Sequence, residues 1–419
     1  MLIAKNFNII LFSLIIPGLV FGPFIPNLLL SVVSIICIFK IIKEKKYYYF
    51  YNKYFICFLI WCFYLILNSL LSKTPLNSLE SSLFYFRFGV FVMAAFYLLE
   101  NNKKTILYFF YSTLFCLILL FSDSFYQYFN SYNIFQIYNF YEVDAMRLSG
   151  LFRDELILGS YFTRIFPLII FLIISIFENN KKILISLLLL ITLITSIIAV
   201  ISGERVALLY FIVSIFLIGL TYIRNNFLII FTSFITFISI ILIVIFSNSN
   251  LKNRIIDKTL IDLDFNNLEK INIFPSSHSD YFNTSIKMFY DNILFGIGPK
   301  NYRIECKSEK YIEFNACSTH PHQTYFQLLA ETGLIGTIPV IVVFMYFIYI
   351  YLQGIIKIYL FNDNQKSTRL KNILSICFII TLLPLIPTGS FFSSWLSVIY
   401  YLPIPFYLYL IRNRNNYEK

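Results

Sequence analysis

The sequence predicts an all-α polytopic membrane protein with about twelve transmembrane helices. Of its 419 residues, 58% are hydrophobic and only 13% are charged, a composition far from that of soluble domains. The apolar residues form runs of about 17–22 residues, the length that crosses a hydrocarbon core of roughly 30 Å. Only helices and closed barrels satisfy their backbone inside a bilayer, and these runs lack the alternation of barrel strands. The fold class is therefore all-α.

The expected spans form one integral membrane domain over residues 1–419. The first run lacks a small-residue cleavage site after it and leads directly into the second, so we expect it to be retained as a helix. By length and hydropathy the spans lie at 7–21, 24–42, 54–72, 82–99, 105–122, 158–177, 183–201, 206–222, 227–246, 326–352, 372–388 and 395–411.

Basic residues cluster in every second connection, which fixes the expected orientation. With twelve spans and both termini cytoplasmic, all these clusters fall on the cytoplasmic side, as the positive-inside rule requires. Topology rather than nucleic-acid binding then explains the net charge of +11. We expect a location in the bacterial inner membrane, with two larger periplasmic segments at 123–157 and 247–325. The clusters are Lys43, Lys45, Lys46 and Lys53; Lys103 and Lys104; Lys181 and Lys182; Arg224; Lys357, Lys366, Arg369 and Lys371; and Arg412, Arg414 and Lys419.

Four arginines gather at the expected periplasmic side: Arg87, Arg147, Arg164 and Arg205. Ionisable residues at membrane depth are costly, which makes each of them a functional candidate. Simpler explanations stay open for single positions. Arg87 and Arg164 could extend to lipid headgroups, and Arg205 could pair with its neighbour Glu204 only to cap a helix turn.

All three histidines, His278, His320 and His322, lie in the second periplasmic segment. Pro321 suits the first turn of a helix, so we expect His322 at the outer end of the tenth span. Further along that span, Gly333 and Gly336 remove side-chain bulk and allow a neighbouring helix to approach closely.

Two cysteines, Cys306 and Cys317, lie in the same segment, eleven residues apart. The periplasm is oxidising, so we expect a disulfide that holds the loop just before the histidines. A zinc site using these cysteines is the less favoured alternative, because Pro321 separates the two nearby histidines and no acidic residue completes a ligand set. We expect neither a metal nor a cofactor, since the cytoplasmic loops are too short for a nucleotide-binding domain and carry no phosphate-binding motif.

The stretch that starts at His322 resembles the signature of the O-antigen ligase and O-antigen polymerase superfamily. That signature is His, then Asn, Ser or Gln, then nine residues, then Gly-x-x-Gly and often Thr or Tyr. It is filled without a gap by His322, Gln323, Gly333, Gly336 and Thr337. The stretches 147–153, 202–205 and 295–303 also look like this family. One departure is that many ligases carry Ser-Arg-Gly at the turn after the seventh span, where this chain has Gly203-Glu204-Arg205-Val206.

The resemblance implies a glycosyltransferase that uses neither a nucleotide sugar nor a metal. Such enzymes move a glycan from an undecaprenyl-diphosphate carrier in the outer leaflet to an acceptor sugar hydroxyl. We expect His322 as general base, and Arg205, Arg147 and Arg164 as the diphosphate-binding residues, because guanidinium groups match phosphate oxygens. The candidates for further contacts with carrier or glycan are Arg87, Glu204, Lys300, Arg303 and Gln323.

Three functions remain open. A ligase would use lipid A-core as acceptor, whereas a polymerase of the same superfamily would use a nascent polysaccharide. A secondary transporter or lipid flippase is the more distant alternative, because the charges lie at the rim rather than the midplane and neither half of the chain repeats the other. Membrane lipids are the expected surroundings in every case.

Overall fold

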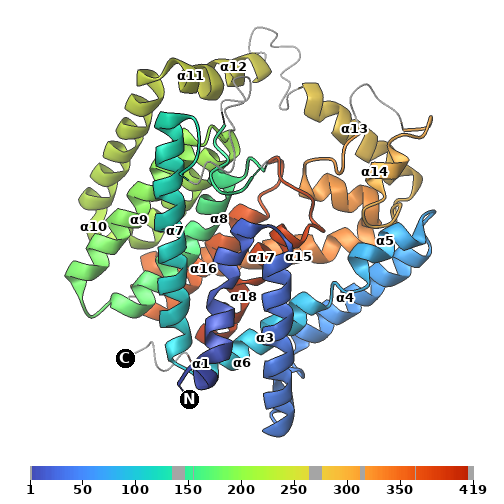
Figure 1. Cartoon of the computed structure of the whole chain (residues 1–419), viewed down its shortest axis with the longest axis horizontal. Helices are drawn as coiled ribbons and strands as arrows, with labels where there is room; N and C mark the ends of the chain where they lie inside the picture. The colour runs from blue at the N-terminus through green and yellow to red at the C-terminus, as the bar shows by residue number, and fades with distance from the viewer. Residues whose placement is uncertain are drawn as a thin grey trace.

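The computed structural model describes residues 2–134, 147–153, 155–263, 276–311, 317–363 and 365–413, and within these ranges it contains helices and no strands (Figure 1). The predicted fold class, an all-α polytopic membrane protein, is confirmed. Arg414 and Lys419, which we placed in the last basic cluster, lie outside these ranges.

The helices follow the apolar runs of the sequence. In chain order they are α1 (Leu2–Ser13), α2 (Ile15–Gly18), η1 (Leu19–Phe21), α3 (Phe24–Lys43), η2 (Tyr47–Tyr49), α4 (Lys53–Leu70), α5 (Pro75–Ser82), α6 (Arg87–Asn101), α7 (Lys104–Asn130), α8 (Leu158–Phe177), α9 (Lys181–Ile201), α10 (Arg205–Ser247), α11 (Ser249–Lys252), η3 (Asn253–Asp257), α12 (Lys258–Leu263), α13 (Ser276–Asp291), α14 (Tyr302–Glu305), α15 (Thr324–Leu360), α16 (Lys366–Thr381), α17 (Ser394–Tyr401) and α18 (Pro403–Arg412).

Nine helices among the described residues are long and apolar enough to cross a membrane, against about twelve expected spans. The expected span at 7–21 is divided among α1, α2 and η1. The spans expected at 206–222 and 227–246 both lie within α10, since the intervening residues 223–226 include no Pro or Gly to end a helix. The span expected at 372–388 stops early, because α16 ends at Thr381, before Pro384 and Pro387.

The C-terminal helices form the centre of the molecule. In Figure 1, α15 to α18 (orange to red) lie between the group α7 to α10 and the group α3 to α6. Helix α16 packs against α8 and α10, and α18 packs against α6. The central position of α15 to α18 places the histidine-bearing part of the chain in contact with both halves.

Ion pairs join polar loops that are distant in the sequence. At one end of the bundle, which we call the basic end, Arg412 at the end of α18 pairs with Glu100 at 3.0 Å, and Lys366 pairs with Glu178. At the other, which we call the histidine end, Lys73 pairs with Glu305 at 2.8 Å.

Helix α15 is broken at Gly333, which has a φ of 60° and a ψ of −164°. A non-helical segment, residues 292–298, lies across the break and hydrogen-bonds to both sides of it. The Ile297 amide donates to the Ala330 carbonyl at 2.9 Å before the break. After the break, the Leu334 amide donates to the Ile293 carbonyl at 2.8 Å. The backbone groups freed by the break are thereby satisfied, as a membrane protein requires.

The two signature glycines have different environments. A Cβ on Gly333 would lie 2.4 Å from the backbone carbonyl of Leu294, so here a loop rather than a helix makes the close approach. Gly336 faces α4, where Trp61 Nε1 donates to the Gly336 carbonyl at 2.9 Å and a Cβ would lie 3.0 Å from the Tyr64 ring.

We predict that Gly333→Ala destabilises the protein strongly. The new Cβ would collide with backbone, and a positive φ at a residue other than glycine costs about 1–3 kcal/mol even without a collision. Thermal unfolding of purified protein in detergent should show a clearly lower Tm. Gly18→Ala is the matched control, because there the nearest atoms are the flexible side-chain ends of Ile25 and Leu29 at 3.2 and 3.3 Å. Equal Tm values for the two variants would contradict this account of the break.

Candidate active site

The carboxylate of Glu204 caps the N-terminus of α8 from a separate part of the chain. Glu204 lies in the tight turn between α9 and α10 and is only 6% exposed. It accepts hydrogen bonds from the Gly159 amide at 2.7 Å and from the Ser160 hydroxyl at 2.7 Å. Burial raises the pKa of Glu204, while the nearby Arg147 opposes the shift. A carboxylate at a helix N-terminus offsets the free amides and the positive end of the helix dipole.

Arg147 is held beside this turn by its own segment of backbone. The Leu148 amide donates to the Ser202 carbonyl at 3.2 Å. Arg147 Nη2 lies 3.7 Å from Glu204 Oε2, and its Nε is buried without a hydrogen-bond partner among the described residues. Glu204 thus has a basic neighbour, Arg147, that is distant from it in the sequence.

Arg205 points to a different element from its neighbour Glu204. Its Nη1 donates to Thr259 Oγ1 of α12 at 3.1 Å. In return, Arg254 of η3 donates from Nε to the Gly203 carbonyl at 3.4 Å. The α11 to α12 region, which lies at the top of Figure 1, therefore sits over the 203–205 turn.

Arg164 follows Ser160 by one helical turn on α8, so both side chains lie on one face of the helix. Arg164 is only 4% exposed. Its Nη2 donates to the Tyr210 hydroxyl at 3.1 Å and to Thr388 Oγ1 at 3.0 Å. Nε and Nη1 are buried and have no partner in the described part of the chain. A buried guanidinium with unused donors is well suited to bind an anion.

Thr388 connects this arginine to the histidines. It lies in the non-helical segment 382–393 between α16 and α17. Its amide donates to the His322 carbonyl at 2.8 Å, and its own carbonyl lies 3.3 Å from His320 Nε2. Sequence reasoning missed Thr388 because it assigned 372–388 to a regular span. The Pro384, Pro387 and Gly389 cluster is the signal that would have revealed a non-helical segment there.

His322 lies just outside α15 rather than within its first turn. The helix starts at Thr324, and Gln323 is its N-cap residue, whose side chain accepts from the Phe326 amide at 2.7 Å. The expectation that Pro321 begins the helix is therefore wrong. His322 adopts a φ of 57°, an uncommon conformation for a residue other than glycine. The bond from Thr388 to the His322 carbonyl helps to hold it.

The His322 ring is partly exposed and has polar and aromatic neighbours. Ser318 Oγ lies 3.0 Å from its Nε2. The ring centroids of Tyr281 and His320 lie 5.1 and 4.2 Å away. Burial lowers the pKa of His320 to about 4, helped by the nearby charges of His322 and Arg303. His320 is thus neutral at neutral pH, which spares His322 a second positive charge at close range.

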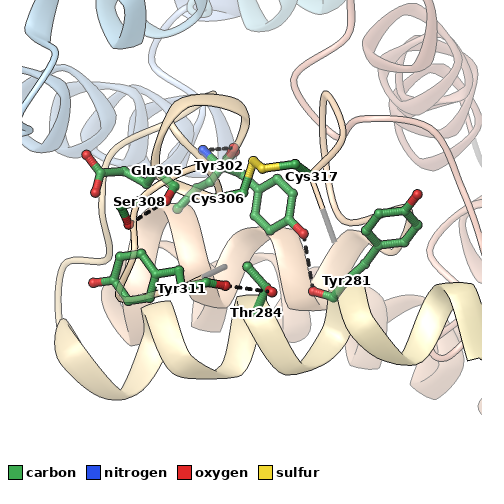
Figure 2. The surroundings of a disulfide bond; sticks show 9 residues. Tyr281, Thr284, Tyr302, Glu305, Cys306, Ser308, Tyr311 and Cys317 are labelled. Carbon is green, nitrogen blue, oxygen red and sulfur yellow. Dashed lines mark hydrogen bonds between the residues drawn. A yellow bond between two sulfur atoms is a disulfide. The ribbon is translucent and has the colours of Figure 1, made fainter. Parts of the chain in front are cut away.

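A disulfide joins Cys306 to Cys317, with a Cα–Cα distance of 5.3 Å (Figure 2). Cys317 directly precedes Ser318, the residue beside His322. On the other side of the bridge, the Cys306 amide donates to the Tyr302 carbonyl at 3.0 Å, and the Tyr302 hydroxyl donates to the Tyr281 carbonyl at 3.4 Å. The disulfide is therefore linked to His322 by two routes, one through the chain and one through α13.

A second contact holds α13 against α15. The rings of Phe282 and Phe326 stack with centroids 4.5 Å apart. Thr284 donates from its hydroxyl to the Tyr311 carbonyl at 3.1 Å, as Figure 2 shows. His278 also lies on α13, near its start.

The remaining candidate residues are Arg303, Lys300 and Arg87. Arg303, in α14, has a buried Nε without a partner among the described residues, and Lys300 precedes that helix with a φ of 59°. Arg87 donates to Ser394 Oγ at 3.3 Å and to Asn27 Oδ1 at 3.5 Å. Those bonds join α6 to α17 and α3, which is a structural role.

Glu331 is a buried carboxylate that sequence reasoning did not single out. It is fully buried in α15 and accepts from Gln327 Nε2 at 2.9 Å and from the Tyr302 amide at 3.3 Å. Its position inside an apolar-looking span was the available signal. Among the described residues, no group of three or more His, Cys, Asp or Glu side chains could hold a metal ion.

Fold and site together define a multi-pass membrane protein in which a buried arginine site is connected to the loop 318–323, which carries His320 and His322 and which we call the histidine loop. A family model described as O-antigen ligase matches residues 190–341. The matched residues include Arg205, His322 and Gly333. Arg147 and Arg164 lie outside the matched part. No curated protein matches the chain. The match supports a membrane glycosyltransferase of the O-antigen ligase and polymerase type.

We predict that loss of the disulfide loosens the histidine loop. A natural disulfide contributes about 2–4 kcal/mol, and this one holds Cys317, which directly precedes Ser318, the residue beside His322. The double variant Cys306→Ser/Cys317→Ser should be cleaved faster by protease between residues 276 and 322 and should have a lower Tm. Cys57→Ser, which changes an exposed free cysteine, should resemble the wild type. Unchanged cleavage in the double variant would show that the bridge does not hold this loop.

We also predict that acid weakens the protein through His320. Its pKa in the folded protein, about 4, is below the ordinary value of 6.5, so the unfolded chain binds the proton more readily. Stability from this residue is complete above pH 6.5 and is lost as the pH falls toward 4. Between pH 7 and 5 the loss should be on the order of 2 kcal/mol. The Tm should fall more between pH 7 and pH 5 in the wild type than in His320→Gln. An equal fall in Tm in both proteins would refute the prediction.

Proposed function

We propose that this protein transfers a glycan from an undecaprenyl-diphosphate carrier to an acceptor sugar hydroxyl, as an O-antigen ligase that uses lipid A-core. The observation that carries the proposal is the chain of contacts from Arg164 through Thr388 to the loop of His322. It connects a buried cationic site to a histidine within the residues that match the family model.

The charges suit the leaving group of this reaction. A diphosphate gains negative charge as its bond to the sugar breaks, and a preorganised guanidinium in a water-poor site stabilises that charge. Among the described residues, two buried donors of Arg164 and one of Arg147 have no hydrogen-bond partner. Together with Arg205 they supply positive charge without a metal ion. Lys300 and Arg303, with Glu204 and Gln323 as supports for the backbone, complete the proposed binding region.

The proposed chemistry is a single displacement. The acceptor oxygen attacks the anomeric carbon, the bond from that carbon to the carrier diphosphate breaks, and His322 accepts the proton of the acceptor hydroxyl. A partly exposed imidazole with a reference pKa near 6.5 can accept a proton near neutral pH. The departing diphosphate keeps the bonding electron pair and stays attached to its lipid in the membrane.

The proposed setting is the bacterial inner membrane, with the histidine end toward the periplasm. The basic residues at the basic end, Lys366 and Arg412 among them, support it, because loops rich in Lys and Arg remain cytoplasmic. Both termini would then be cytoplasmic, and the site would face the leaflet that presents the carrier-linked glycan.

We predict that a strain lacking this gene displays lipopolysaccharide with bare core while carrier-linked polymer accumulates. The wild-type gene should restore full-length ladders on a gel, and His322→Ala should not, because the general base is lost. An epitope tag must show equal amounts of both proteins in the membrane. Purified wild-type protein should also remain active in EDTA, since arginines rather than a metal bind the diphosphate.

The same gel separates the alternatives. Core that carries a single repeat unit in the deletion strain would identify a polymerase, and an unchanged ladder would return the transporter or flippase to consideration. Full restoration by His322→Ala would refute the assignment of the base. Asn tolerates a positive φ, so His322→Asn is the control that removes the base while keeping the backbone conformation.

A further inference from the structure

We propose that Thr388 is a positioning residue that holds the diphosphate-binding arginine and the histidine loop in one geometry. The inference rests on the proposed function, and it assigns a role to the segment 382–393. One residue makes a polar contact with each of three partners: its hydroxyl with Arg164, its amide with His322 and its carbonyl with His320.

The segment around Thr388 is anchored on both sides by α15. At its start, the Tyr325 hydroxyl donates to the Leu382 carbonyl at 2.8 Å. At its end, Gln327 Nε2 donates to Ser390 Oγ at 3.0 Å, and the Phe391 amide donates to Gln327 Oε1 at 2.8 Å. The backbone around Thr388 therefore has little freedom to move relative to α15.

The hydroxyl of Thr388 orients the guanidinium of Arg164. The hydroxyls of Thr388 and Tyr210 both accept hydrogen bonds from Arg164 Nη2. The donors Nε and Nη1 have no partners among the described residues. Without Oγ1, Tyr210 alone would hold Nη2, and the plane of the guanidinium could rotate about that single bond. The two remaining donors would then no longer be fixed relative to His322.

The role of the hydroxyl can be separated from the shape of the side chain. Thr388→Val keeps the branched shape and removes the hydroxyl, whereas Thr388→Ser keeps the hydroxyl. A hydrogen bond to a charged group contributes about 1.5–3 kcal/mol, so Thr388→Val should lower kcat/KM for a carrier-linked glycan by roughly tenfold or more. Thr388→Ser should recover most of that loss.

The assay is transfer by the full-length purified protein from a carrier-linked glycan to lipid A-core, with each substrate varied in turn. We expect Thr388→Val to raise KM for the carrier-linked glycan and to leave KM for the acceptor unchanged. A merely destabilised protein would lose active molecules, which lowers kcat and leaves both KM values alone. In an Arg164→Gln background, Thr388→Val should cause little further loss, because the two residues act as one unit.

Thr381→Val is the matched control. Thr381 is also a buried threonine, near the end of α16, and its hydroxyl bonds only to the Cys377 carbonyl of its own helix in the contacts of the described chain. Its kinetics should equal those of the wild type.

The outcomes distinguish the inference from the function on which it depends. An inactive wild-type protein would overturn the proposed function. An active wild type with an equally active Thr388→Val would overturn only the role of Thr388. Equal losses in Thr388→Val and Thr388→Ser would also overturn it, because the hydroxyl would then not be the group that matters.

Discussion

The structure depends on one constraint: a polypeptide in a membrane must satisfy its own backbone hydrogen bonds. An unsatisfied backbone group costs several kcal/mol in hydrocarbon, yet three non-helical segments surround the candidate site. Two of them are held by bonds to α15, and the third, the loop that precedes α15, is held by a bond from Thr388. Residues 292–298 bond to both sides of the break at Gly333, residues 382–393 bond to Gln327 and Tyr325, and the His322 carbonyl accepts from Thr388. The broken helix is therefore the scaffold on which the site is assembled.

Charge is distributed by the same logic. Glu204 offsets the free amides of α8 and faces Arg147, so this acid and base lie together at the histidine end. Arg164 lies one turn further along α8, and two of its buried donors remain without partners in the described part of the chain. A protein that only needed structural stability would gain by replacing such a residue with an apolar one. The buried guanidinium of Arg164 therefore supports the proposed binding of an anionic ligand.

Sequence reasoning found the parts of this arrangement that follow from composition and spacing. Long apolar runs predicted the helical membrane fold, and the spacing of Cys306 and Cys317 pointed to the pair that the structure joins. It failed where tertiary contacts decide. Thr388 was assigned to a helix because a hydropathy scale does not account for the helix-breaking effect of Pro384 and Pro387. His322 was placed at the start of a helix that in fact begins two residues later. A pair between Glu204 and the adjacent Arg205 was only one open explanation, and the approach of Arg147 to Glu204 from a distant segment could not be foreseen. Such pairings depend on how helices pack, which periodicity alone does not encode.

The disulfide has a consequence for how the protein matures. In the proposed orientation, the loop that carries the histidines would acquire this cross-link only after it has left the reducing cytoplasm, because disulfide formation needs an oxidant. A chain inserted in the opposite direction would keep both thiols. The presence of the disulfide would therefore report the direction in which the chain was inserted into the bilayer.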